Sequence, residues 1–288
     1  MSGTTRGALW MTTAVVLFSM MTILIRMVGD DIPPYEIIFV RGMVSMAILV
    51  PWLMRVGMVG LRTSRKGLLF SRGALTSIGL ILWIYALTRM PLAEVVALHF
   101  TLPLFGVILA VIFLREQVDA HRWGAIALGF LGTAVILRPG VAAIDPVAFL
   151  VLASALAYAG TGVVTKILVK TESSAAIVFY VSLFTALAFA IPCAIHWVAP
   201  SPEQWAMLLA IALLNVLGQS CLNRSLTAAD ASFVLPFDFL RLPFAAAAGV
   251  WLFSESPDIW TFIGAGIIFG ATYYPTWRER RKQARAPD

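Results

Sequence analysis

Residues 86–116, ALTRMPLAEVVALHFTLPLFGVILAVIFLRE, and residues 225–255, SLTAADASFVLPFDFLRLPFAAAAGVWLFSE, are two versions of one pattern. The two stretches align without a gap when the chain is displaced by 139 residues, and Glu116 then falls on Glu255. Apolar segments resemble one another through composition alone, but polar positions that coincide on a single displacement argue against chance. The sequence therefore predicts two copies of one structural unit.

The composition of the chain is that of a membrane protein. Of its 288 residues, 60% are hydrophobic and 12% are charged, and the mean hydropathy is +0.89. Soluble domains carry roughly 25% charged residues. A core of this size can bury only part of so many apolar side chains, so the remainder is expected to face lipid.

Apolar segments of about the length that crosses a bilayer, ~20 residues, recur along the whole chain. Lipid offers no hydrogen-bond partner to the backbone, so such segments are expected to be helices. The expected segments cover about residues 7–28, 34–54, 67–88, 91–113, 120–138, 146–168, 174–197, 203–224, 229–253 and 257–277. The predicted fold is an all-α integral membrane protein with ten transmembrane helices.

The repeat divides these helices into two units of five. A unit with an odd number of helices begins and ends on opposite sides of the membrane, so the second copy is expected to be inverted. The predicted domains are a first repeat (1–139), a second, inverted repeat (140–277) and a basic tail (278–288). Inverted repeats that share one site near the membrane midplane are typical of transporters.

The basic residues indicate the orientation. The net charge is +6 and the chain has 21 Lys and Arg residues. With a cytoplasmic N-terminus, most of them fall on the cytoplasmic side, and Arg26, Arg89 and Arg138 fall on the other. The positive-inside rule then places both termini in the cytoplasm. The basic tail is expected to contact anionic lipid, and no nucleic-acid partner is expected, because no aromatic groups interleave with the charges.

A charged pair, Asp238 and Arg241, lies deep inside the ninth segment, three residues apart on one helix face. A charge at that depth costs about 2.5–3.5 kcal/mol on insertion scales, so the pair is expected to face protein or water. One reading is an ion pair that only fixes packing. In the other, Asp238 meets an ammonium group or a proton and Arg241 meets a carboxylate. Pro236 and Pro243 flank the pair and are expected to bend the helix.

The repeat places His99 opposite Asp238, so the middles of the fourth and ninth segments are expected to meet. An amide stripe follows on the eighth segment, where Asn215, Gln219 and Asn223 recur every four residues. The candidate substrate-binding residues are His99, Trp83, Tyr85, Tyr158, Gln219, Asn223, Asp238 and Arg241. These groups suit a zwitterionic or aromatic solute, and they are too poor in cations for a phosphorylated one.

Structural alternatives remain for several of these side chains. His99 could be a neutral histidine bonded to a neighbour, and Trp83 could belong to the aromatic belt at the membrane interface. The amides could join helices without lining a cavity.

Charged residues near the helix ends are expected to be structural. Glu116 and Glu255 begin loops and are expected to cap helices or form salt bridges. Arg26 and Lys166 are related by the repeat, and both are expected to anchor helix ends. Arg41 lies deeper and is expected to need a partner.

The last segment carries Gly266 and Gly270, which follow the small-x-x-x-small spacing of close helix contacts. The contact is expected either within the monomer or across a homodimer.

The chain resembles a known family. Residues 85–140 and 223–255, which contain the two quoted stretches, are similar to the end of an EamA domain. This resemblance implies the drug/metabolite transporter superfamily, whose larger members have ten helices in two inverted halves. Members export amino acids and other metabolites, take up riboflavin or S-adenosylmethionine, or move nucleotide sugars. YddG-like exporters of aromatic and other amino acids are the closest in type.

The expected function is therefore that of a secondary transporter of the bacterial inner membrane that works by alternating access, with export of amino acids favoured. Uptake of riboflavin or S-adenosylmethionine is the alternative. A membrane-embedded enzyme is disfavoured, because the sequence has no metalloprotease motif, phosphate-binding loop or nucleophile elbow. A channel would need rings of identical groups. No metal or cofactor is expected, and proton coupling through His99 or Asp238 stays open beside facilitated diffusion.

Overall fold

The computed structural model describes residues 3–56, 63, 65–138, 145–172, 174–229 and 231–283. In these ranges the regular structure is helical, without a strand, as predicted. The elements are α1 (Gly3–Val28), α2 (Pro34–Val56), α3 (Lys66–Leu87), α4 (Leu92–His99), α5 (Leu102–Leu114), α6 (Ala120–Leu137), α7 (Pro146–Leu168), α8 (Ser174–Ile195), α9 (Pro202–Ala228), α10 (Ala231–Val234), the 3-10 helix η2 (Leu235–Leu240), α11 (Arg241–Phe253) and α12 (Ile259–Gln283). These elements begin and end close to the ten expected segments, two of which are each divided.

Length and apolar composition alone identify seven membrane spans among the described helices. They are α1, α3, α4 together with α5, α6, α7, α8 and α9. The apolar part of α12, Ile259–Tyr274, is shorter, and η2 divides the segment 231–253 into short pieces. The multi-pass character is therefore established, and the crossing of all ten segments stays a prediction.

Large apolar side chains cover the outside of the bundle. Trp251 is 82% exposed, Ile191 69% and Phe113 68%, and they lie on three different helices. A soluble monomer rarely exposes apolar patches of this kind on several sides, because contact between apolar surface and water is unfavourable. Lipid is the solvent that this surface fits.

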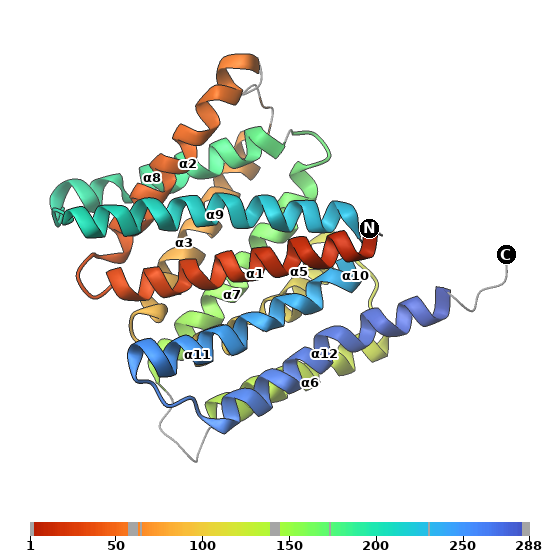
Figure 1. The fold of residues 1–288 in the computed structure, drawn as a ribbon. Coiled ribbons are helices and arrows are strands. Elements are labelled where there is room, and N and C mark those ends of the chain that lie inside the picture. The colour runs from red at the N-terminus through yellow and green to blue at the C-terminus, as the bar shows by residue number, and fades with distance from the viewer. Residues whose placement is uncertain are drawn as a thin grey trace.

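The largest helix contacts keep their partners when the two predicted halves are exchanged. α1 packs on α9 as α7 packs on α3, and α2 packs on α9 as α8 packs on α3. The pairs α2–α8 and α6–α12 map onto themselves. Figure 1 shows α6 and α12 side by side along one edge of the bundle and α2 and α8 at the opposite edge. The pattern agrees with the predicted repeat.

Glycine residues allow a close contact between α6 and α12. They are Gly132 and Gly264, and not Gly266 and Gly270, which the sequence analysis indicates. A Cβ on Gly264 would lie 2.5 Å from the carbonyl oxygen of Gly132, and a Cβ on Gly132 would lie 2.8 Å from that of Gly264. By contrast, a Cβ on Gly266 or Gly270 would meet nothing within 4 Å. Those two glycines face open space, so the homodimer through them stays a prediction.

The two ends of the bundle differ. At the end where α1 and α11 finish and α4 begins, Ile25, Leu87 and Leu92 are at most 1% exposed. At the opposite end, where α1 begins and α12 finishes (Figure 1), Gln219 is exposed although it lines the polar cavity described below. These are called the closed end and the open end below.

Candidate functional site

Two helix breaks build the site. α4 ends at His99 and α5 follows with Pro103 in its first turn. In the second half, η2 begins with Pro236 in its first turn, and α11 starts only after it. Proline cannot donate a backbone hydrogen bond, which explains why regular α-helix stops at these positions. The α-helix gives way to a 3-10 helix at Pro236, where the sequence predicts a bend, whereas Pro243 fits within the first turn of α11.

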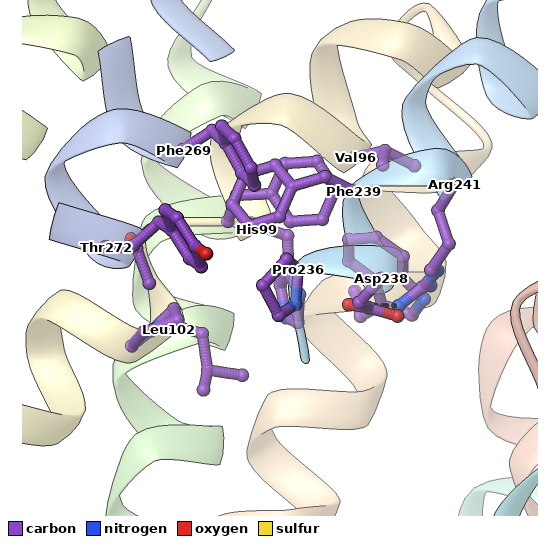
Figure 2. Close-up of a pocket in the computed structure, with 13 residues that line it drawn as sticks. Val96, His99, Leu102, Pro236, Asp238, Phe239, Arg241, Phe269 and Thr272 are labelled. Carbon is purple, nitrogen blue, oxygen red and sulfur yellow. Dashed lines mark ion pairs between the residues drawn. The ribbon is translucent and has the colours of Figure 1, made fainter. Parts of the chain in front are cut away.

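The breaks bring the middles of the two segments together, as the repeat predicts. The rings of Phe100 and Phe239, which are equivalent in the repeat, stack with centroids 4.1 Å apart. Arg241 forms an ion pair with Asp238, with 3.8 Å between Nη1 and Oδ2. Figure 2 shows this pair on one side of the pocket and the phenylalanine rings beside it.

Two cavities share this wall. The aromatic cavity, of about 410 Å³, is lined by Trp83, Val96, His99, Phe100, Leu102, Pro103, Pro236, Asp238, Phe239, Arg241, Phe269, Thr272 and Tyr273. The polar cavity, of about 310 Å³, is lined by Met11, Phe18, Met21, Ile25, Arg41, Leu80, Trp83, His99, Leu102, Tyr158, Asn215, Gln219, Leu222, Asp238 and Arg241. His99, Asp238 and Arg241 therefore face both spaces.

The aromatic cavity has rings on its walls and two unsatisfied polar atoms. Phe269 packs edge-on against Phe239 at 4.6 Å and parallel to Tyr273 at 5.8 Å. His99 Nε2 and Thr272 Oγ1 are buried and have no hydrogen-bond partner among the described residues. Buried polar atoms are normally paired. A solute or water molecules in this cavity would supply the missing partners.

Thr272→Val tests this reading, because valine keeps the shape and removes the hydroxyl. Loss of one neutral hydrogen bond of about 0.5–1.5 kcal/mol is expected to raise the apparent KM of the solute roughly 2- to 12-fold. The thermal unfolding midpoint is expected to hold or rise slightly, because the hydroxyl has no partner to lose. An unchanged KM in transport assays would contradict the assignment.

The polar cavity contains an unpaired cation. Arg41 lines it and makes no ion pair or hydrogen bond with the described residues, although the sequence predicts that a charge so deep needs a partner. Asp238 and Arg241 already compensate each other. Arg41 therefore gives the cavity an excess of one positive charge. Carboxylates are the anions that a guanidinium binds most specifically.

Most of the predicted site residues come together, and two do not. The cavity walls include Trp83, His99, Tyr158, Gln219, Asp238 and Arg241. Tyr85 is 39% exposed and stacks under the guanidinium of Arg89, and Asn223 is exposed and lines neither cavity. The roles of all eight stay predictions.

The alternative of an interfacial Trp83 is wrong. Its side chain is 5% exposed and its ring centroid lies 4.3 Å from that of His99. The sequence did not indicate Phe269, Thr272 and Tyr273, because only the packing of α12 brings them to the site. Arg41 could have been selected from the sequence as a site residue, because it is a charged residue deep in an apolar segment.

The sequence pattern of the EamA-like transporter family matches residues 5–138 and again residues 146–275. The chain belongs to this family. As an EamA-like transporter it moves small molecules across a membrane and is not an enzyme. The two matches lie within the predicted repeats 1–139 and 140–277, whose bounds and inversion stay predictions.

Named relatives of this EamA-like protein carry different solutes. It is 30% identical to an S-adenosylmethionine uptake transporter of Rickettsia prowazekii (strain Madrid E), with 96% of this chain and 95% of the relative covered. It is 34% identical to a riboflavin transporter of Brucella anthropi, over 84% and 88%. It is 30% identical to the pseudopaline exporter CntI of Pseudomonas aeruginosa, over 91% and 93%. A solved structure with 17% identity shares the fold, with a TM-score of 0.67 over 97% of this chain and 99% of that one.

Proposed function

We propose that this EamA-like protein is a secondary transporter of the bacterial inner membrane for a small zwitterion that carries an aromatic or heteroaromatic ring. The observation that carries the proposal is the unpaired Arg41 beside the Asp238–Arg241 pair, next to a cavity walled with aromatic rings. The carboxylate of the solute binds Arg41 and Arg241, and its ammonium group binds Asp238. The ring stacks in the aromatic cavity.

Amino acids, including aromatic ones, satisfy both halves of this site, and the proposed direction for them is export. Uptake of S-adenosylmethionine is the second candidate, because that solute combines an amino-acid head with an adenine ring and relatives over nearly the whole chain bear its name. Riboflavin has a flat ring but no ammonium–carboxylate pair. Riboflavin therefore has no carboxylate to bind Arg41 and no ammonium group to bind Asp238.

The proposed mechanism is alternating access between two inverted repeats, residues 1–139 and 140–277, with both termini and the tail 278–288 in the cytoplasm. The exchangeable helix contacts and the two family matches support the repeat. In this orientation the open end faces the cytoplasm. A second copy of the chain is proposed to pack against Gly266 and Gly270, which face open space.

Counterflow in proteoliposomes tests the solute class. Tryptophan, phenylalanine, alanine, S-adenosylmethionine and riboflavin would each compete for exchange of a labelled solute. We expect saturable exchange of ring-bearing zwitterions, with alanine weaker because it leaves the aromatic cavity empty. Exchange of riboflavin alone, or equal exchange of alanine and tryptophan, would contradict the proposal.

We further propose that Asp238, which faces both cavities, carries a coupling proton. Asp238→Asn is expected to abolish the acceleration of uptake into liposomes by a pH gradient, and to slow solute exchange about tenfold, because the ammonium group loses its counter-charge. The measurement is initial uptake with and without the gradient. The same gradient dependence in Asp238→Asn as in the parent protein would favour facilitated diffusion.

A further inference from the structure

Two ion pairs occupy equivalent places in the two halves, at opposite ends of the bundle. Arg26 at the end of α1 pairs with Glu255 after α11, with 3.3 Å between Nη2 and Oε1. Lys166 at the end of α7 pairs with Glu116 after α5. Each pair joins the first helix of one half to the broken helix of the other half. The first pair lies at the closed end and the second at the open end.

The closed-end pair is part of a larger set of bonds. The side chains of Arg26 and Glu255 are only 18% and 10% exposed. Arg26 Nη1 donates to the carbonyl oxygen of Leu87 at 2.6 Å, and Glu255 Oε2 accepts the backbone N–H of Leu92 at 2.8 Å. Together these bonds tie α1 and the end of α11 to the turn between α3 and α4. Bonds to charged groups are worth more when they are shielded from water.

The backbone places the Glu255 carboxylate for this contact. Ser254 adopts a left-handed conformation with φ 54°, and the N–H of Glu255 donates to the carbonyl of Gly249 at 2.8 Å. A Cβ on Gly249 would lie 2.6 Å from Glu255 Oε2, so a larger residue there would displace the carboxylate from its present position. In the other half, Arg115 has the matching φ of 55°, but Ala110 stands where Gly249 would be.

The open-end pair lacks these additional bonds. The side chains of Lys166 and Glu116 are 60% and 37% exposed. Among the described residues, neither bonds to the backbone of 226–231, the turn that corresponds to the α3–α4 turn. α11 packs on α4 at the closed end, whereas extensive packing between their counterparts, α5 and α10 with η2, is absent from the described contacts. Both ion pairs are therefore formed, but only the closed-end pair is bonded to the neighbouring turn.

We propose that Arg26 and Glu255 form a latch that holds the closed end shut, and that Lys166 and Glu116 form its counterpart. When the open end closes, Glu116 approaches the N–H of Ala231, the counterpart of Leu92, and the bonds of the first latch break. These four residues line neither cavity. They are positioning residues, because they act only on the access of solute to the site. The Cβ of Ala110 takes up the space that Gly249 leaves free, and the N–H of Glu116 lies 3.4 Å from the carbonyl oxygen of Ala110, against 2.8 Å in the other half. The second latch is therefore the weaker of the two, which favours the state seen here.

The latch rests on the proposed alternating access and not on the identity of the solute, so distances measured without solute test it. Spin labels on cysteines introduced at Asp30 and Ser256 report on the closed end, and labels at Lys170 and Gln117 report on the open end. All four positions are exposed, and the two native cysteines are buried. In the parent protein, the first pair is expected to give mainly one short distance.

Glu255→Gln removes the charge and keeps an oxygen that can accept the N–H of Leu92. We expect it to raise the ratio of open to closed populations at the 30–256 pair at least tenfold, and to shorten the 170–117 distance. Glu116→Gln is the matched control, because it removes the same charge from the open-end pair and is expected to leave the 30–256 distance as it was. Thermal unfolding confirms that both variants are folded.

Two results would overturn the latch. An unchanged 30–256 distance in folded Glu255→Gln would show that the ion pair does not hold the end. Equal opening in Glu116→Gln would show a general loosening in place of a latch. Failure of solute exchange in the parent protein, with these shifts intact, would count against the proposed solute class alone.

Discussion

Arg41→Gln is expected to raise the apparent KM for a carboxylate-bearing solute about 30-fold or more. Removal of one partner from a shielded charge pair costs about 2–5 kcal/mol. Arg41 lines the polar cavity beside Tyr158 and Gln219 and has no ion pair or hydrogen bond within the described residues. The solute carboxylate is therefore the main partner that this guanidinium stands to lose. Initial rates of exchange against solute concentration measure the effect.

Stability separates this role from a structural one. Because Arg41 is an uncompensated charge in the solute-free protein, Arg41→Gln is expected to leave the thermal unfolding midpoint unchanged or raise it. Arg41→Lys keeps the charge without the bidentate fork and is expected to show an intermediate KM. A lower unfolding midpoint with an unchanged KM would mean that Arg41 holds helices together and does not bind the solute.

Gly264→Val is expected to destabilise the protein by about 3 kcal/mol or more. The new Cβ would lie 2.5 Å from the carbonyl oxygen of Gly132 and 2.4 Å from Ile136 Cγ1. Overpacking costs typically 1–3 kcal/mol when side chains can yield, and here one of the obstacles is backbone. α6 and α12 would have to separate along the edge of the bundle. Thermal unfolding in detergent, followed by size-exclusion chromatography, measures the loss.

Gly266→Val is the matched control, two residues along the same helix. A Cβ at Gly266 meets nothing within 4 Å, so the expected change is within about 0.5 kcal/mol. The same variant tests the proposed homodimer, because a partner seated on Gly266 would be displaced and the oligomer would dissociate without loss of monomer stability. Equal destabilisation by Gly264→Val and Gly266→Val would contradict the packing described for α6 and α12.

The interrupted helices show which parts of the site a sequence repeat can predict. The displacement of 139 residues placed His99 opposite Asp238, and the structure puts both on the wall shared by the two cavities. Helix spacing selected Asn223 together with Gln219, and Asn223 is exposed and lines neither cavity. Spacing along a helix identifies the residues on one face, but the rotation of that face toward a cavity depends on neighbouring helices.

The sequence by itself determined the all-helical class, the position of each helix, and the meeting of the fourth and ninth segments. These follow from local rules, since lipid forces backbone hydrogen bonds into helices and proline interrupts them. Only the tertiary structure decided that Arg41 and Thr272 face the site, that Gly132 and Gly264 make the close contact, and which end is shut. In a transmembrane helix, the face that contacts lipid and the face that contacts protein are both apolar. The periodicity of apolar residues therefore distinguishes these two faces poorly. The end at which the helices close over the cavities depends on contacts between residues far apart in the sequence, so a local pattern does not reveal it.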